Sequence, residues 1–294
     1  MTPACPNPTC SSYRCDTFVA KDGHFYRHSE ARFIQRFKCT KCRKKFSHAT
    51  GTLEFGQKKR RVNAILRNIL CSSVSMRRCA LVLNIHRTTV ERKLIYLAKK
   101  ANKSQQEFLA GLRGSVTHLQ FDDLITSEHT KMKPLTISLA VDANRRYILA
   151  TSVASIGAFG LLAERSRKKY GRRPNHHKKA LKNLFDTMAP TIAPTALVQS
   201  DEHTFYPAFV QTYLPGTDYR RHPGGRGAIV GQGELKKLKY DPLFMLNHTC
   251  AFLRANINRL VRRSWCTTKK PAMLQRHLDI LVDFYNQDYL PRLK

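Results

Sequence analysis

The sequence predicts a multidomain chain with a small cysteine-rich module, a basic all-helical domain and an α/β domain, in that order. Three observations predict it. Five of the nine cysteines fall within the first 42 residues, a basic segment with helical patterning follows, and beyond residue 115 strands that end on carboxylates alternate with helices. We place the three parts at residues 1–56, 57–114 and 115–294, with a basic insertion at about 215–240 in the last.

The charge and composition of the chain exclude several classes of protein and favour others. Of 294 residues, 52 are Lys or Arg and 20 are Asp or Glu, which gives a formal net charge of +32, while 42% of the residues are hydrophobic. Nucleic acid is the expected partner for such a charge, with an acidic membrane surface second. Nine cysteines are too sparse for a secreted disulfide scaffold, and no apolar run approaches the roughly 20 residues of a membrane span. The N-terminus, MTPACPNPTC, lacks a basic head followed by an apolar stretch, so we expect a soluble intracellular protein.

The cysteine-rich module predicts a structural zinc site. Cys39 and Cys42 form a C-x2-C pair in FKCTKCRKKF, and Cys5 and Cys10 form a looser C-x4-C pair. Thiolates from two such pairs complete a tetrahedral zinc site. A module of this size carries too little core to fold without the metal.

The segment between the two cysteine pairs predicts a hairpin with its turn at Asp22-Gly23. The hairpin and the two pairs together indicate a four-cysteine zinc ribbon. Cys15 is either a spare thiol or an alternative ligand to Cys10.

The second segment predicts helices. From Lys58 to Lys103 there are 13 Lys or Arg and one acid, and apolar residues recur at helical spacing from Val62 to Leu70. Ser73 or Ser75 can cap a second helix. From Asn102 to about residue 114 we expect the end of the last helix and a linker.

A short turn at residues 84–86 and a third helix capped by Thr88 or Thr89 give the layout of a DNA-binding helix-turn-helix. The residues that would then meet base edges and phosphates are Arg87, Thr88, Thr89, Glu91, Arg92 and Lys93. The alternative is a basic three-helix bundle whose charges are merely solvated.

Beyond residue 115 the pattern changes to α/β. A strand in SVTHLQFDDLIT ends on two adjacent carboxylates, Asp122 and Asp123. Two further strands, LTISLAVD and YILATSVAS, are joined by a tight turn at residues 142–145, which predicts a hairpin directly after the acidic strand.

A basic helix is expected from about His177 to Met188, followed by a short buried strand at 196–200 that ends on Asp201. Apolar stripes at 246–261 and 273–284 predict two long helices at the end of the chain. A strand ending in Asp, a hairpin, a helix, a second strand ending in Asp and long helices is the ribonuclease-H-like arrangement.

Asp122 and Asp201 are the candidate catalytic acids. Carboxylates at neighbouring strand ends can share divalent ions, which activate water and stabilise the leaving oxygen in phosphodiester cleavage. Hard oxygen ligands that leave water positions open suit Mg²⁺, or Mn²⁺ in its place. The alternative is that the two acids merely cap loops.

The whole chain resembles the DDE-type transposases of bacterial insertion sequences, nearest to the insertion-sequence-one-like group and more distantly to Merlin-like elements. The matching pieces are FKCTKCRKKFS, the helix-turn-helix, FDDL with the downstream Lys131 and AVD, QSDEHTFYP, and the most specific block, LRANINRLVRRSWCTTKK with FYN after it. The resemblance implies that Asp122 is the first catalytic acid, with Asp123 where the family often has Glu, and that Asp201 is the second.

The sequence departs from the family at the third acid. Aligning the leucine-arginine step on Leu253-Arg254 puts Asn247 where the family has Glu, followed by His248, and the nearest acid upstream is Asp241. Asn247 can offer a carbonyl oxygen as a weaker metal ligand, and His248 a nitrogen or a general base. The site is then D-D-N or D-D-H, or else the copy is degenerate and inactive.

Basic clusters are expected to hold DNA phosphates. Residues 165–182 predict a loop that runs into a helix, residues 221–239 a mobile basic loop or a plain solvated insertion, and a third cluster surrounds Trp265, which we expect in the core rather than stacked on a base. Asn247, Ala251, Arg254 and Asn258 are spaced to share one helix face. The predicted contacts outside the helix-turn-helix are Arg172, Arg173, Lys178, Lys179, Arg254, Arg259, Arg262 and Arg263.

We therefore expect a transposase that binds terminal inverted repeats and performs strand cleavage and strand transfer with two magnesium ions. Its partners are double-stranded DNA, as transposon ends and target, and further copies of itself in a homodimer or larger assembly, without a membrane partner. It is expected in the bacterial cytoplasm, associated with the nucleoid. The alternatives are a catalytically inactive, domesticated regulator that binds specific DNA sequences and a nuclease acting on RNA–DNA hybrids.

Overall fold

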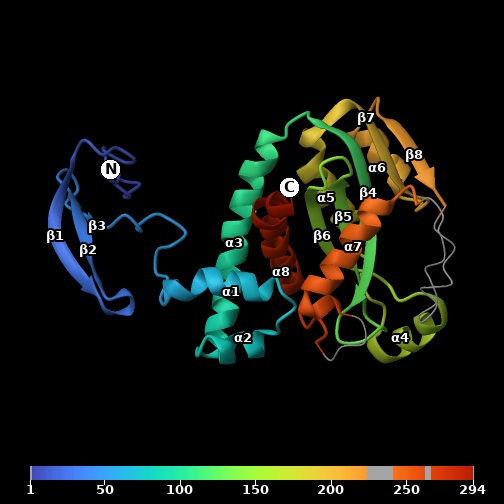
Figure 1. Cartoon of the computed structure of the whole chain (residues 1–294), viewed down its shortest axis with the longest axis horizontal. Coiled ribbons are helices and arrows are strands. Elements are labelled where there is room, and N and C mark those ends of the chain that lie inside the picture. The colour runs from blue at the N-terminus through green and yellow to red at the C-terminus, as the bar shows by residue number, and fades with distance from the viewer. Residues whose placement is uncertain (1, 224–240, 262–265, 294) are drawn as a thin grey trace. The chain divides into compact units, whose positions relative to one another are not determined.

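The computed structural model describes residues 2–223, 241–261 and 266–293 (Figure 1). The chain forms two compact units, Met1–Leu66 and Arg67–Lys294, which we describe separately. Within the described ranges, no helix is both long and apolar enough to cross a membrane.

The N-terminal unit contains a small antiparallel sheet of β1 (Val19–Arg27), β2 (Arg32–Cys39) and β3 (Lys45–Phe46), in the order β1-β2-β3. The expected hairpin is confirmed, because β1 pairs with β2. Its turn was predicted wrongly at Asp22-Gly23. The chain turns instead at residues 28–31, where Ala31 has φ +49°.

Gly23 marks a bulge inside β1. Its φ is +68°, and the register of β1 on β2 shifts between Lys21 and His24. A glycine with positive φ suits a bulge as well as a tight turn, so the Asp-Gly signal alone does not separate the two.

Three helices follow, α1 (Asn63–Leu70), α2 (Met76–Val82) and α3 (Arg87–Gly111). Ser75 caps α2 as expected, because its hydroxyl accepts a hydrogen bond from the amide of Arg78. The cap of α3 is His86, whose Nδ1 accepts from the amide of Thr88, so the prediction of a threonine cap was wrong.

Helix α3 also runs about two turns beyond the expected end at Asn102. Gln105 lies in this extension and donates to the carbonyls of Ile148 and Leu149 at 3.1 and 3.2 Å. Leu109 is buried in the main core. The sequence predicted a helix end and a linker from Asn102 to about residue 114, but these tertiary contacts extend the helix to Gly111.

The remainder of the C-terminal unit is built on one mixed sheet. Its strands are β4 (Val116–Ser127), β5 (Pro134–Asp142), β6 (Ile148–Ser155), β7 (Ile192–Asp201) and β8 (Asp218–His222), and the helices are α4 (Ala163–Tyr170), α5 (His177–Met188), α6 (Tyr206–Tyr213), α7 (Phe244–Asn256) and α8 (Pro271–Phe284). The strand order is β6-β5-β4-β7-β8. Strands β4, β5 and β6 are antiparallel neighbours, whereas β7 runs parallel to both β4 and β8.

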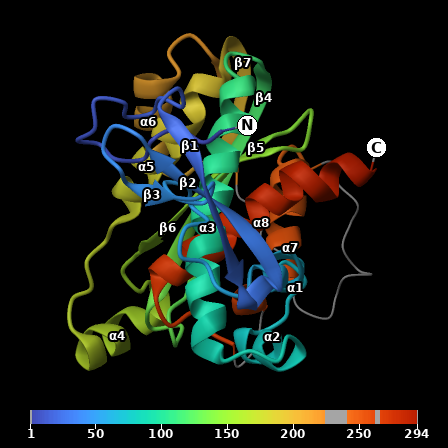
Figure 2. The ribbon, with the colours of Figure 1, turned by 90° about the vertical axis from the view of Figure 1, so that its left-hand side faces the viewer.

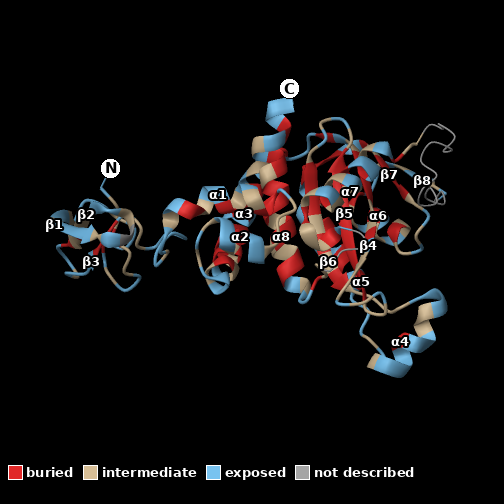
Figure 3. Cartoon of the chain, turned by 60° about the horizontal axis from the view of Figure 1, so that its bottom comes forward, coloured by how far each residue is buried: buried red, intermediate tan, exposed pale blue. Residues whose placement is uncertain are grey.

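Helices α5 and α7 cover opposite faces of this sheet. Phe121 of β4 packs edge-on against Phe185 of α5, with the ring centroids 5.3 Å apart. The neighbouring Gln120 points the other way and accepts a hydrogen bond from the amide of Leu246 in α7. Successive side chains of a strand alternate between faces, so the two contacts fix the two layers. Figure 3 shows the buried residues gathered in the strands between these helices.

Helix α8 packs beside α3 and closes the free edge of β6 (Figures 1 and 2). Gln275 of α8 accepts from the amide of Val153, and Asn286 just beyond α8 accepts from the amide of Ile148. An uncovered edge strand would present unpaired amides and carbonyls to other chains. Here the side-chain amides of Gln275 and Asn286 form hydrogen bonds with backbone groups of that edge.

Candidate functional site

The two predicted acids lie side by side on parallel strands. Strand β4 pairs with β7 through Gln120 and Gln199, and each acid comes two residues after its glutamine. Asp122 and Asp201 therefore occupy equivalent positions on the same side of the sheet. Asp201 ends β7 as expected. Asp122 and Asp123 do not end β4, however, because this strand continues to Ser127 in its pairing with β5.

Burial and neighbouring charge make the Asp122 carboxyl hard to ionise. Burial, the Asp201 carboxylate and the adjacent Asp123 raise the pKa of Asp122 to about 7. Its Oδ1 accepts from the amide of Asp123 at 2.6 Å, and the Tyr206 hydroxyl lies 3.2 Å away. Like charges held this close are what a bound cation would neutralise.

Asp123 has a different environment. Its Oδ1 accepts from the hydroxyls of Thr136 and Ser138 at 2.8 and 2.6 Å, and its Oδ2 is 2.5 Å from His177 Nε2 and 2.7 Å from the Tyr206 hydroxyl. Burial raises the pKa of Asp123, but the hydrogen bond and charge of His177 and the other donors outweigh it, so the pKa is lowered. Because these partners bind both carboxylate oxygens, Asp123 fixes the position of β4 relative to α5 and α6.

The four partners of Asp123 were not predicted from the sequence. One signal was present, because Thr136 and Ser138 are polar residues two positions apart in the otherwise apolar strand LTISLAVD, and both are fully buried. Alternate hydroxyls on a buried strand face indicate a polar group opposite. No comparable local signal marks His177 or Tyr206, which reach the site from α5 and α6.

Buried glutamines support the strands below the acids. Gln120 donates to Gln199 at 2.9 Å and to the carbonyl of Pro242 at 2.8 Å. Gln199 is also bonded to His118 at 2.6 Å and to His222 at 3.0 Å. This network ties β4, β7, β8 and the start of α7 together, and so fixes the level at which Asp122 and Asp201 meet.

The two residues expected as the third ligand beside Asp122 and Asp201 do not face these acids. Asn247 is exposed, and its amide donates to the carboxylate of Asp241 at 2.9 Å. His248 is also exposed, with its ring near Phe244. On the same helix, burial and the Asp122 carboxylate raise the pKa of Cys250 to about 12.

The polar helix face expected from residue 247 to residue 258 is shorter in the structure. The helix ends at Asn256, and Asn258 follows in a 3₁₀ turn where its amide donates to the carbonyl of Ser73. Ser73 in turn donates its amide to the carbonyl of Asn256 at 2.9 Å. These contacts fasten the loop between α1 and α2 to the end of α7.

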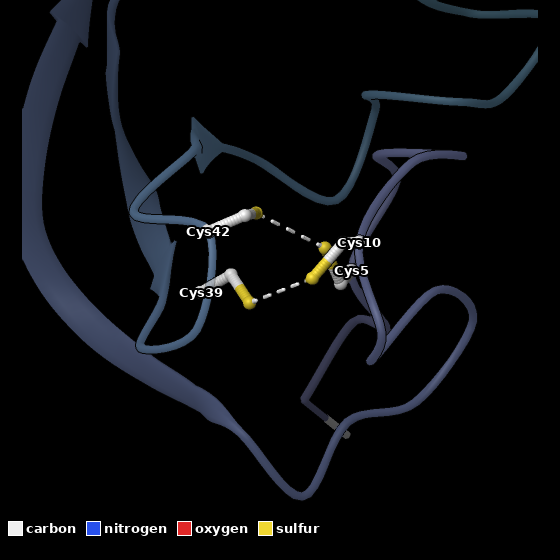
Figure 4. A group of neighbouring side chains, drawn as sticks. All are labelled: Cys5, Cys10, Cys39 and Cys42. Atoms are coloured by element: carbon white, nitrogen blue, oxygen red, sulfur yellow. Dashed lines mark hydrogen bonds between the residues drawn. The ribbon is translucent and has the colours of Figure 1, made fainter.

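The four predicted zinc ligands come together in the N-terminal unit (Figure 4). The Sγ atoms of Cys5, Cys10, Cys39 and Cys42 all lie within 4.8 Å of one another, with Cys5 to Cys42 at 3.7 Å and Cys10 to Cys39 at 3.9 Å. A tetrahedral site with Zn–S bonds of about 2.3 Å requires sulfurs about 3.8 Å apart. Cys15 is outside this cluster and bonds Thr17.

The thiols of the cluster differ in acidity. Burial raises the pKa of Cys5 to about 12, whereas a hydrogen bond from the backbone of Lys44 lowers the pKa of Cys42 to about 6. Within the described part of the chain, this is the one group of three or more Cys, His, Asp or Glu side chains close enough to ligate a metal. Among the described residues of the C-terminal unit, Asp122 and Asp201 thus form a pair of candidate ligands without a third close enough to join them.

The predicted DNA contacts differ in exposure. Arg87, Thr88, Arg92, Arg172, Lys178 and Lys179 are exposed, and Thr89 is half-buried. Lys93 is only 2% exposed, because it lies on the inward face of α3 with Val90 and Leu97, so it is removed from the contact surface. Arg173 pairs with Glu128 at 3.1 Å.

The remaining predictions concern the end of the chain. Arg254 and Arg259 are half-buried, and Arg259 donates to the sulfur of Met76. Arg262, Arg263 and Trp265 lie outside the described residues, as does most of the predicted loop at 221–239.

Comparison of the sequence with models of known protein families and with curated proteins gives no match.

Proposed function

We propose that the chain is a DNA transposase that binds the ends of its element and cleaves and joins DNA strands with divalent metal ions. The observation that carries this proposal is the pairing of Asp122 and Asp201 at equivalent positions on adjacent parallel strands. Two carboxylates in this arrangement, with positive charge around them, suit phosphodiester chemistry.

The sheet supports a ribonuclease-H-like assignment for the C-terminal unit. Strands β4 to β7 follow the order expected from the sequence, with helices on both faces of the sheet. Strand β8 was not expected, because Asp218–His222 lies in the segment predicted as a basic insertion at about 215–240. Asp122 sits on the central strand of this sheet and Asp201 on its neighbour, which is the placement that the proposed chemistry requires.

The acid pair fits a magnesium or manganese ion. Asp122 and Asp201 would hold it. Burial and the Asp201 carboxylate raise the pKa of Asp122, and a bound cation would favour its ionised form. Bound there, the metal would activate water and stabilise the leaving oxygen. Asp123, anchored by His177 and Tyr206, keeps the backbone at Asp122 in place.

The DNA-binding assignment is supported by the capped pair α2 and α3. A short turn at residues 83–86 separates them, and Arg87, Thr88 and Arg92 are exposed at the start of α3. Such residues can meet base edges in the major groove. A zinc ion in the four-cysteine cluster would stabilise the N-terminal unit.

We also propose that the protein works on two DNA ends as a homodimer or larger assembly, associated with the nucleoid in the bacterial cytoplasm. The experiment that tests the function uses labelled element-end DNA, a target plasmid and Mg²⁺. End fragments joined to the plasmid by the wild type, and lost in Asp122→Ala and Asp201→Ala, are expected. Joining that persists in both variants would contradict the assignment.

A second candidate function, a DNA-binding regulator without catalysis, is favoured by the environment of Asn247. Its amide is bonded to Asp241, and no third acid joins the pair within the described residues. If the wild type is silent and Asn247→Glu gains cleavage, the chain is an inactive copy. Cleavage by the wild type would exclude the regulator.

A further inference from the structure

A cavity of about 700 Å³ lies in the C-terminal unit, along the part of β4 that follows Asp122 and Asp123. Its walls come from the end of β4, the loop after it, the turn before α4 and the segment that follows α7. This volume falls within the range of about 300–1,000 Å³ typical of ligand sites.

The walls of the cavity are fastened to one another. The amide of His129 donates to the carbonyl of Thr268 at 2.9 Å, which joins the loop after β4 to the segment before α8. The Ser166 hydroxyl donates to the carbonyl of Met132 at 2.6 Å, and Lys133 lies over the ring of Tyr170, so α4 is held to the same loop.

The cavity lies along the face of β4 that carries Asp122. Leu124 lines it and lies two residues farther along β4 on the same face as Asp122. From the opposite wall, Arg254 lines it one helical turn after Cys250. Helix α7 packs on β4, where the amide of Leu246 donates to Gln120 at 3.1 Å, so the strand and the helix both run from this level of the sheet to the cavity.

The lining combines apolar surface with positive charge. Leu124 and Leu260 form buried apolar wall, and Phe159 offers an aromatic ring that is 62% exposed. Lys131 and Arg259 add cationic groups, while no Asp or Glu occurs among the described lining residues. Two acids adjoin lining residues in the sequence: Glu128 pairs with Arg173 at 3.1 Å, and Asp123 is bonded to His177 and Tyr206.

We propose that this cavity receives one unpaired nucleotide, swung out of the DNA next to the strand held at the acid pair. A nucleobase has an apolar face that can stack on Phe159 and polar edges that Thr130 and Thr267 of the lining can bond, and its phosphate matches the cationic groups there. A base inside the duplex cannot reach such a pocket. The proposal rests on the proposed DNA function and adds to it a site for a single extruded nucleotide.

The test compares two fluorescein-labelled 30-base-pair duplexes of one sequence, fully paired or carrying one unpaired thymidine, at constant low salt. The wild type is expected to bind the second duplex about fivefold or more tightly, the size of one stacking contact. Phe159→Ala should bring the ratio of the two dissociation constants close to one. Phe244→Ala is the matched control, because Phe244 is 59% exposed and lies outside the cavity lining, and it should keep the wild-type ratio.

Lys131→Ala, at an exposed cavity position, is a second variant and should also reduce the ratio. Melting curves by circular dichroism verify that each variant is folded. Equal binding of both duplexes by the wild type, or an unchanged ratio in Phe159→Ala, would overturn the nucleotide site and leave the proposed function intact. Failure to bind either duplex would instead overturn the DNA function, and the nucleotide site with it.

Discussion

Ionising the carboxyl group of Asp122 costs more free energy in the folded chain than in the unfolded chain. Burial and two acidic neighbours raise its pKa to about 7 from an ordinary value of 3.8. The folded chain therefore keeps a proton that the unfolded chain releases. The contribution of the protonated carboxyl group to the stability of the fold is fully present below about pH 3.8 and is lost as the pH rises to about 7.

Asp122→Asn should consequently raise the melting temperature of the metal-free protein at pH 8 and have little effect near pH 4. The gain in unfolding free energy at pH 8 is on the order of 2–4 kcal/mol. Asp186→Asn is the control, because Asp186 is exposed and paired with Lys182 at 2.7 Å, and it should give no gain. A lower melting temperature for Asp122→Asn at pH 8 would contradict the electrostatic account.

Tyr206 acts through its hydroxyl. The side chain is fully buried, and the hydroxyl lies 2.7 Å from Asp123 Oδ2. Tyr206→Phe keeps the ring and leaves the buried carboxylate with one donor fewer, so we expect a loss of about 1–3 kcal/mol in unfolding free energy, measured by urea denaturation. Tyr213→Phe, which removes an exposed hydroxyl bonded to Asp186 at 3.0 Å, should change it by less than about 0.5 kcal/mol. Equal losses in the two variants would contradict the anchoring role of Tyr206.

At the scale of elements, the sheet depends on side chains that close its edge. Asn286, only 2% exposed, accepts from the amide of Ile148 at 3.0 Å and donates to the Ile148 carbonyl at 2.8 Å and to Gln105 at 3.1 Å. Asn286→Leu should lower the unfolding free energy by about 2–4 kcal/mol, because buried polar groups lose their partners. Gln287→Leu changes the exposed neighbour and should have little effect in the same denaturation experiment. A neutral Asn286→Leu would show that α8 holds the edge by apolar packing alone.

The N-terminal unit should depend on its metal. Cys39→Ser removes one of four clustered thiols, and we expect the zinc content per chain to fall well below one. Residues 2–66 should then become sensitive to proteases. Cys15→Ser is the matched control, because Cys15 lies outside the cluster, and it should retain zinc. Full zinc content in Cys39→Ser would rule out the proposed ligand set.

The sequence predicted most elements and missed those decided by tertiary contacts. The strand at Asp201 and the helix at 177–188 carry strong local patterns and lie where expected. The length of α3 depends on Gln105 meeting β6, and the continuation of β4 beyond Asp123 depends on β5. Neither partner is visible in a local window of sequence.

For the whole molecule, the scarcity of acids was the most useful signal. With 20 Asp or Glu against 52 Lys or Arg, Asp122 and Asp201 could be picked out before their strands were known to be neighbours. The third metal ligand could not be predicted in this way, because the direction in which a side chain points depends on how its helix is rotated about its axis. Helix α7 turns Leu246, Thr249 and Leu253 inward and leaves Asn247 exposed.

The positive charge of the chain can offset the repulsion between the acid pair and DNA. Carboxylates would repel DNA unless a bound metal and the surrounding cations offset them, and a net charge of +32 supplies much of that field. Binding should accordingly weaken with salt. The central claim is that the acid pair cleaves DNA strands only with a divalent ion.

The most direct measurement is the nicking rate of supercoiled plasmid that carries the element ends, in Mg²⁺ and in EDTA. We expect nicking by the wild type in Mg²⁺ only, a loss of at least about a hundredfold in Asp122→Asn or Asp201→Asn, and an unchanged rate in Glu202→Ala, which alters the exposed acid next to the site. Metal-independent nicking, or wild-type rates in the Asp122→Asn and Asp201→Asn variants, would contradict the account.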